Sequence, residues 1–132
     1  MREIKFKGKS KLNNEWLFGD LLRLGGNRTP CIFSDKDSIR DFNAHNGVVI
    51  PETIEQFTGL KDKKGVDIYD GDIIKNNNDI IIVLWNDKYA GFTLHCENWS
   101  CLSFFYEDIY PEKCEIIGNI HDNPELLNNL NQ

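Results

Sequence analysis

Residues 48–75 read VVIPETIEQFTGLKDKKGVDIYDGDIIK, a block in which turn-forming residues separate short β-prone segments. Pro51 restricts the residue before it to an extended backbone, and residues 54–58 have the composition of a strand. The apolar residues 73–74 start another strand directly after the last turn signal. The block therefore predicts short strands joined by tight turns.

The turn signals of this block account for its aspartates and glycines. An Asp-x-x-Gly pattern at residues 62–65 predicts a type I turn, which closes a hairpin with a return strand over residues 66–69. The Asp-Gly-Asp sequence at residues 70–72 predicts a second tight turn, because glycine readily adopts a positive φ. Turn aspartates bond the local backbone, so we assign a structural role to Asp62, Gly65, Asp70, Gly71 and Asp72.

The segments before this block predict a hairpin followed by irregular structure. Apolar residues alternate with lysines in residues 4–7, and an aromatic β-prone run follows at residues 16–18, which together favour a β-hairpin. Consecutive glycines and a proline indicate a loop over residues 25–30. The weak pattern of residues 31–47 predicts an irregular segment.

The segments after the block predict further strands and a short final helix. Residues 80–85 form a continuous β-branched and apolar run, and residues 92–96 alternate with their even-numbered side chains toward the core. Residues 115–120 predict the last strand. Asparagine, proline and an acid at residues 122–127 indicate a helix start. Residues 99–110 fit strand and helix templates equally and stay unassigned.

Length and composition favour one domain of mainly β structure. The chain has 132 residues, of which 40% are hydrophobic and 27% charged, as in ordinary globular domains. We expect an α+β, mainly β fold: an SH3-like small barrel with a short C-terminal helix over residues 48–132, and an N-terminal β-hairpin annex within residues 1–47. Apolar runs long enough for a membrane span or a signal peptide are absent, which favours a cytoplasmic protein without membrane contact.

The charge distribution restricts nucleic-acid binding to one segment. The net charge is −6, yet residues 1–30 carry seven basic and three acidic residues, a net charge of +4. An extended strand would display alternate lysines on one face near aromatic residues, a pattern typical of nucleic-acid contact. A solvated strand face or an edge protected by lysines gives the same pattern. The candidate contacts to DNA or RNA are Lys5, Lys7, Lys9 and Lys11.

Metal-binding and catalytic patterns are weak. The four cysteines show no CxxC spacing, and adjacent strand residues such as His95 and Cys96 point to opposite faces, which disfavours a zinc site with Cys101 and Cys114. Buried free thiols are the simpler interpretation of these residues and of Cys31. We expect no metal site.

Catalytic alternatives have little support from the residues. A metal-dependent hydrolase would use the carboxylates of Asp20 and the turn aspartates, and the pair His121-Asp122 could orient an imidazole. The chain offers no recognisable nucleophile motif beside that pair, and it lacks nucleotide-binding loops. We therefore expect a non-enzymatic protein without a cofactor, with the hydrolase as the weakest alternative.

An aromatic stretch and a charge asymmetry favour an interaction protein. Residues 99–110 are rich in aromatic side chains, and residues 104–132 carry six acidic residues and one lysine, a net charge of −5. Opposite charges at the two ends of the chain could meet across a subunit contact or within one subunit. The candidate interaction surface is Trp99, Phe104, Phe105 and Tyr106.

Three segments of the chain resemble the YopX family of phage and prophage proteins. They are REIKFKGK with EWLFGDLL near the start, the VIPETIEQFTGLKDKKGVDIYDGDIIK block, and EIIGNIHDNPELL near the end. Lys7 and Glu55 depart from the residues commonest in the family, and lysine lacks the planar fork of arginine. The resemblance implies an α+β fold with an SH3-like barrel, a phage or prophage origin in a bacterial host, and a homo-oligomer. It brings no established catalytic or binding residues, and a host or phage partner stays unidentified.

Overall fold

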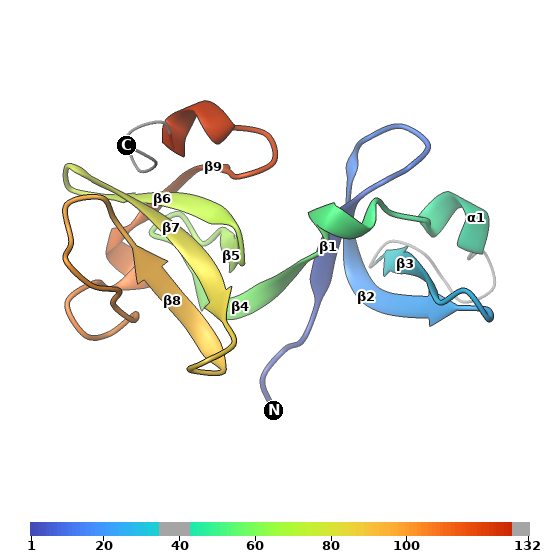
Figure 1. Ribbon diagram of the computed structural model, residues 1–132, viewed down its shortest axis with the longest axis horizontal. Coiled ribbons are helices and arrows are strands. Elements are labelled where there is room, and N and C mark those ends of the chain that lie inside the picture. Colours follow the sequence, from blue (N-terminus) through green and yellow to red (C-terminus); the bar gives the residue numbers. More distant parts are fainter. Residues whose placement is uncertain (35–42, 128–132) are drawn as a thin grey trace. The chain divides into compact units, whose positions relative to one another are not determined.

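The computed structural model describes residues 1–34 and 43–127, and its backbone is mainly β (Figure 1). The chain divides into two compact units, Met1–Phe57 and Thr58–Gln132. The strand pairings are antiparallel in both units. The prediction of a mainly β fold is confirmed.

The first unit begins with the predicted hairpin. Strand β1 (Phe6–Lys9) pairs with β2 (Trp16–Leu24), and Lys9 lies opposite Trp16 at the turn end. The strand begins two residues later than the alternating pattern suggested, since Ile4 precedes it and is exposed. The β2 strand is also longer than its aromatic run, because it pairs along most of its length with a third strand.

The third strand, β3 (Thr29–Ser34), corrects the prediction of a loop and an irregular segment. Pro30 argued against a strand because it cannot donate to a ladder, but it stands near the beginning of the terminal strand in the order of its sheet. The loop is limited to residues 25–28. A helical turn, α1 (Ala44–Gly47), is also present, and residues 35–42 lie outside the described part of the chain.

Residues 48–53 hold the end of β1 in place through backbone and side-chain hydrogen bonds. The Ile50 N–H donates to the Lys9 carbonyl oxygen at 2.8 Å. The Lys9 N–H in turn donates to Oγ1 of Thr53 at 2.8 Å. Pro51 starts a 3-10 helix, η1 (Pro51–Thr53), so the proline terminates one extended segment and begins the turn before the next.

Strand β4 (Glu55–Lys61) confirms the strand predicted over residues 54–58. Its first residues pair with β1, where Glu55 lies opposite Lys7. The chain passes from the first unit to the second within this strand. Strand β4 also neighbours β5 (Asp67–Tyr69), which is the predicted return strand.

The second unit contains a four-stranded sheet in the order β8-β7-β6-β9. Hairpin turns join β6 to β7 and β7 to β8. The strands are β6 (Asp72–Asn76), β7 (Asp79–Asn86), β8 (Gly91–His95) and β9 (Glu115–Asn119). All three strands predicted over residues 80–85, 92–96 and 115–120 are confirmed.

One apolar cluster forms the core of this unit. Even-numbered side chains of β8 face it, as predicted, with Leu94 fully buried and Phe92 packed against its edge. Aliphatic side chains dominate the cluster because β-branched residues pack well on pleated surfaces. Its buried members are Ile68, Ile74, Ile81, Val83, Leu94, Cys96, Ile109 and Cys114.

Two features of the second unit differ from expectation. The described strands form open sheets and not a closed barrel. The final helix is present as a short 3-10 turn, η3 (Pro124–Leu127), and residues 128–132 lie outside the described chain. The Asn123 side chain does not serve as the predicted cap, because its Oδ1 accepts a hydrogen bond from the Asn119 N–H at 3.2 Å.

Candidate functional site

The candidate nucleic-acid residues are partly covered by other side chains. Lys7 is only 6% exposed, and its Nζ lies 4.5 Å from the centre of the Trp16 ring. The Lys9 Nζ lies 5.4 Å from the same ring, and the Lys5 Nζ lies 4.9 Å from the Phe57 ring. These positions correspond to cation–π contacts, in which a ring face stabilises the ammonium group.

This arrangement corrects the expectation of an exposed ribbon of lysines. Lys7 and Lys9 share one face of the strand, where both lie over Trp16, but Lys7 is buried and lies opposite Glu55, which is 8% exposed. Lys11 is exposed beyond the end of β1. A nucleic-acid contact would therefore involve the ends of this lysine row more than its middle.

The carboxylate of Asp62 organises the turn between β4 and β5. Its Oδ1 accepts hydrogen bonds from the N–H groups of Lys64 and Val66, both at 2.9 Å. Its Oδ2 accepts a third from the Ile116 N–H at 3.1 Å. Burial alone would raise the pKa of Asp62, but these three backbone donors and the nearby Lys64 charge hold it below its ordinary value. The carboxylate is thus occupied by the backbone.

The aspartates of the next turn also bond the backbone. Asp72 is buried, and its Oδ2 accepts a hydrogen bond from the Tyr69 N–H at 2.7 Å. Asp70 Oδ1 accepts one from the Trp85 N–H at 3.0 Å. Gly71 has a φ of 88°, which a residue with a Cβ rarely adopts. These contacts are typical of turn residues, and they occupy carboxylate oxygens that a metal ion would need.

The cysteines and histidines do not form a metal site in the described chain. Cys96 and Cys114 are buried in the apolar cluster, whereas Cys101 is exposed. The Nε2 of His95 lies 2.8 Å from Oγ1 of Thr93, and burial lowers the pKa of this histidine. Across residues 1–34 and 43–127, no group of three or more His, Cys, Asp or Glu side chains could hold a metal ion.

The buried thiols have the properties of small apolar side chains. Burial, with a smaller effect of nearby carboxylates, raises the pKa of Cys114 to about 11, and burial also raises that of Cys31. Thiolate is the reactive form, so these two groups are unsuited to nucleophilic chemistry. The pair His121-Asp122 is held by Asn119, whose side chain accepts from both backbone N–H groups.

The four residues of the candidate interaction surface have different environments. Trp99 and Phe105 pack against the apolar cluster, so they cover the core. Phe104 meets Tyr89 edge-on, with ring centres 5.6 Å apart. Tyr106 is 55% exposed, and its hydroxyl donates to Oε2 of Glu112 at 3.2 Å.

A second aromatic pair extends this surface. The Tyr106 ring lies 5.7 Å from the Tyr110 ring in an edge-to-face arrangement. Tyr89 is 50% exposed and Tyr110 is 40% exposed. We name Tyr89, Phe104, Tyr106 and Tyr110 the aromatic surface, because residues 104–106 connect its two ring pairs.

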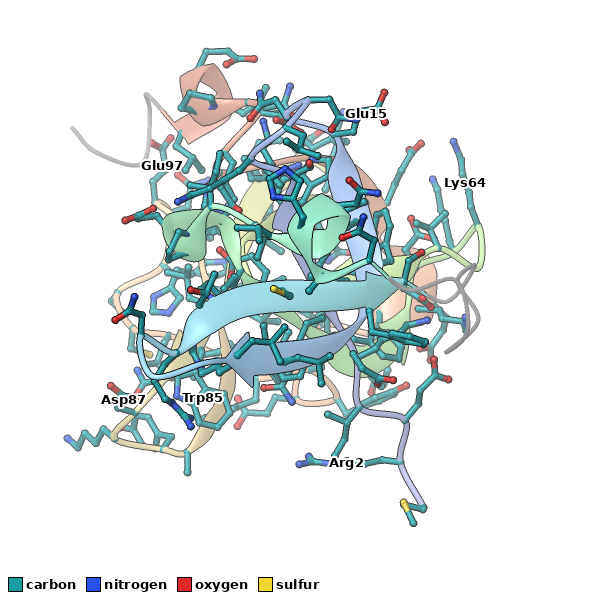
Figure 2. All side chains as sticks on the ribbon, turned by 90° about the vertical axis from the view of Figure 1, so that its right-hand side faces the viewer. Arg2, Glu15, Lys64, Trp85, Asp87 and Glu97 are labelled. Atoms are coloured by element: carbon teal, nitrogen blue, oxygen red, sulfur yellow. The ribbon has the colours of Figure 1, made fainter. Side chains whose placement is uncertain are left out.

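A separate aromatic side chain, Trp85, lies exposed on β7. Its Nε1 donates to Oδ1 of Asp87 at 2.7 Å, and Figure 2 shows the two side chains next to each other. Its ring meets Phe92 edge-on at 5.3 Å. Trp85 is thus exposed, but its ring contacts both Asp87 and Phe92.

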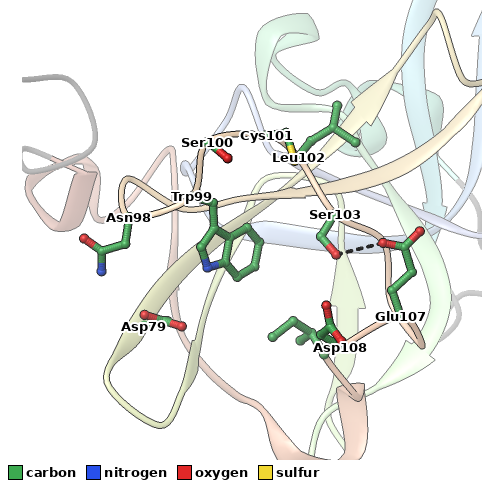
Figure 3. A pocket seen from close by; sticks show the side chains of 10 residues that line it. Asp79, Asn98, Trp99, Ser100, Cys101, Leu102, Ser103, Glu107 and Asp108 are labelled. Carbon is green, nitrogen blue, oxygen red and sulfur yellow. Dashed lines mark hydrogen bonds between the residues drawn. The ribbon is translucent and has the colours of Figure 1, made fainter.

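A cleft of about 520 Å³ opens between the start of β7 and the loop over residues 98–109. Figure 3 shows the Trp99 indole at the centre of this site, with Asp79 on one side and Ser103 on another. The loop is held in place by β8, because Leu94 and Ser103 exchange two backbone hydrogen bonds of 2.8 and 2.9 Å. The indole therefore has a fixed support.

The cleft is acidic. Asp79, Glu107 and Asp108 contribute carboxylates, and none of the residues around the cleft is basic. Ser103 Oγ donates to Oε2 of Glu107 at 3.2 Å, which orients that carboxylate. Within the described chain, the carboxylates of Asp79 and Asp108 take part in neither a hydrogen bond nor an ion pair. A cleft that contains an indole ring and several carboxylates attracts a cation and repels an anion.

Comparison with known proteins places the chain in a family. Residues 5–128 match the YopX protein family. The chain belongs to the YopX family. A solved structure titled "Crystal structure of protein EF1440 from Enterococcus faecalis" is similar to this YopX chain, with 26% sequence identity and a TM-score of 0.51. The match covers 96% of this chain and 99% of the other, so the similarity extends over both units. No curated protein matches.

Sequence reasoning on this YopX family member found part of the cleft. It singled out Trp99 but did not connect it with Asp79, Glu107 and Asp108. Asp79 is separated from the indole by a whole hairpin, so only the pairing of β7 with β8 brings them together. A membrane-spanning helix is absent from the described part of the chain.

Proposed function

We propose that this YopX protein is a non-enzymatic accessory protein of a phage or prophage that self-associates through its second unit. The observation that carries the proposal is the aromatic surface. Its three tyrosines are 40–55% exposed, although an apolar core is available in the same unit. Tyrosine is enriched in protein interfaces because its ring supplies contact area and its hydroxyl a hydrogen bond. We also propose that the protein is cytoplasmic and that strands β6 to β9 are arranged as in an SH3-like barrel.

A second copy of the chain is the partner we favour for this surface. Residues 104–132 have a net charge of −5, and residues 1–30 a net charge of +4. The basic segment of one copy complements the acidic segment of another, which would fix the register of the contact. Lys88 and Lys113 lie over Tyr89 and Tyr110, so the surface itself combines rings with charges.

The proposal of a non-enzymatic protein is supported by the hydrogen bonds of the turn carboxylates and by the pKa of a buried thiol. The buried aspartates of the turns accept backbone hydrogen bonds, which explains their presence without chemistry. The raised pKa of Cys114 removes it as a nucleophile at neutral pH. Structural roles thus account for the turn aspartates and for Cys114, which supports a non-enzymatic protein.

Sedimentation velocity at micromolar concentration, with and without a labelled oligonucleotide, tests this function. We expect a species larger than the monomer, and we expect the double variant Tyr89→Ser/Tyr110→Ser to shift it toward the monomer. Val66→Ser is the matched control, because Val66 is 50% exposed in the same unit but lies outside the aromatic surface. A wild-type monomer across the concentration range contradicts self-association.

Nucleic-acid binding through the N-terminal strand is the second candidate. Lys9 lies over Trp16 near the exposed Lys11, so ammonium groups and an aromatic ring occur side by side, as on single-strand binding surfaces. Co-sedimentation of the oligonucleotide at low salt would support this function. Lys9→Ala/Lys11→Ala should abolish it, whereas the exposed control pair Lys61→Ala/Lys75→Ala, which lies outside the aromatic surface, should not. No co-sedimentation at low salt excludes it.

A further inference from the structure

We propose that the cleft around Trp99 binds the guanidinium side chain of an arginine from a protein partner. The ligand would stack its planar group on the indole and pair with the surrounding carboxylates. Arginine suits both contacts, because its guanidinium is planar, always charged and able to donate several hydrogen bonds at once. The inference deepens the proposed function, since it assigns one contact of the self-association.

The shape of the cleft matches a side chain better than a bare ion. Its volume of about 520 Å³ lies within the range of small-ligand pockets. A metal ion would need three or more ligand groups converging on one point, and the described residues provide no such group. The separated carboxylates of Asp79 and Asp108 instead leave room for an extended cation between the walls.

The charge of the cleft selects the ligand class. Three acidic residues and no basic residue line the cleft, so phosphate groups and carboxylate ligands would be repelled. The carboxylates of Asp79 and Asp108 have no partner within the described chain, so an incoming cation would not have to break an existing ion pair. Glu107 is already oriented by Ser103, which reduces the entropy lost on binding.

The favoured source of the arginine is a second copy of this chain. Arg2 is exposed, and it belongs to the segment with the net charge of +4. The other residues of the segment 1–4 are exposed as well, which leaves them accessible to another molecule. An arginine on a different basic protein has the same chemistry, so the experiment below separates the two sources.

Cys101 provides a direct measurement of occupancy. It lines the cleft and is exposed, whereas the other three cysteines are buried. Alkylation by iodoacetamide is followed by mass spectrometry of the intact protein in the Arg2→Ala background, in which Arg2 of a second copy cannot fill the cleft beforehand. Its rate should fall when a blocked hexa-arginine peptide fills the cleft. We expect a reduction of at least about fivefold at saturation. A blocked hexaglutamate peptide should leave the rate unchanged.

Variants distinguish the cleft from general charge attraction. Asp79→Asn/Asp108→Asn should remove the protection, while the exposed Glu125→Gln, which lies outside the cleft, should retain it. Circular dichroism and labelling of a single thiol would show that each variant is folded. Absence of protection by hexa-arginine, equal protection by hexaglutamate, or full protection in the double variant would each overturn the proposal.

The same samples separate failure of this site from failure of self-association. If the wild type is a monomer but hexa-arginine protects Cys101, the cleft binds arginine and the source is another protein. If the wild type self-associates and Arg2→Ala weakens the assembly, a second copy is the source. Self-association without any protection of Cys101 by hexa-arginine overturns the cleft proposal and leaves the aromatic surface as the contact.

Discussion

The two units of the chain differ in their cores, since a large apolar cluster lies in the second and a facing lysine and glutamate are buried in the first. In the second unit, eight side chains form one apolar cluster, and most are aliphatic. In the first unit, the buried positions include Lys7 and Glu55, which lie opposite each other on β1 and β4. Ser10 and Thr53 are buried in the first unit as well.

This difference determines what each unit tolerates. Apolar burial is non-directional and scales with area, so a core accepts changes that conserve volume. A buried lysine or glutamate is stable only while its charge has a suitable environment, and loss of one partner leaves the other charge buried. The apolar cluster of the second unit should therefore respond to lost volume, whereas the facing Lys7 and Glu55 of the first unit and the buried Asp62 of the second should respond to lost polar contacts.

Leu94→Ala should produce the largest loss of stability. Leu94 is fully buried in the apolar cluster, and its truncation leaves a cavity that costs about 3–4 kcal/mol. The matched change Ile32→Ala in the first unit should cost about 2–3 kcal/mol, because fewer apolar side chains are buried there. Urea unfolding followed by circular dichroism measures both. A larger loss for Ile32→Ala would break the contrast between the units.

Asp62→Ala should be the next most harmful change. It leaves three backbone N–H groups without their acceptor, at a cost of about 2–3 kcal/mol. Exposed Glu97 provides a control, and Glu97→Ala should change stability by less than about 0.5 kcal/mol. An Asp62→Ala variant as stable as the control would show that the turn forms without its carboxylate.

The same carboxylate gives a pH dependence with a defined sign. The pKa of Asp62 is lowered in the folded state from 3.8, so its contribution is complete above the unfolded value and is lost as pH falls through the lower folded value. Between neutral pH and strongly acidic pH, the wild type should therefore lose more stability than Asp62→Ala. Parallel losses in urea titrations at these pH values would contradict the role of the backbone donors.

Gly118→Ala should have an intermediate effect. A Cβ on Gly118 would lie 2.5 Å from Oδ1 of Asn123, so the loop must shift at a cost of about 1–3 kcal/mol. Gly8→Ala would place its Cβ 3.1 Å from Cβ of Val49 and should cost about 1 kcal/mol. Gly26 has open space and is the control. Equal thermal midpoints for all three variants would disprove both close contacts.

Cys101→Ser should change the stability of the protein least, while it alters the reaction of the protein with thiol reagents. In the native protein, one cysteine should react rapidly with a thiol reagent, and Cys101→Ser should abolish this reaction with little change in stability. Cys114 is buried with a pKa raised to about 11, so it should react only after unfolding. Rapid reaction of a second thiol would mean that the cluster of the second unit opens readily.

Local patterns predicted most strands of the second unit. Alternating and continuous apolar runs, separated by Asp and Gly, correctly located β5 to β9, because hairpins are specified by neighbouring residues. The strand β3 was missed, since Pro30 and a short apolar run obscure it. Its formation depends on pairing with β2, a tertiary effect that propensity does not contain.

The candidate sites were harder to predict because they depend on environment. The spacing placed Lys7 and Lys9 on the face where both lie over Trp16, but the burial of Lys7 follows from β4 beside it. The acidic wall of the cleft combines Asp79 with residues beyond the next hairpin. Residue types at these positions were visible in the sequence, whereas their convergence was not.

The fluorescence of Trp16 should report on the lysines that lie over its ring. Trp16 is the tryptophan of the first unit, since the other two, Trp85 and Trp99, belong to the second. In a Trp85→Phe/Trp99→Phe background, intrinsic fluorescence would arise from an indole flanked by the Lys7 and Lys9 ammonium groups at 4.5 and 5.4 Å. Its emission would then report when the N-terminal strands separate, independently of the aliphatic core.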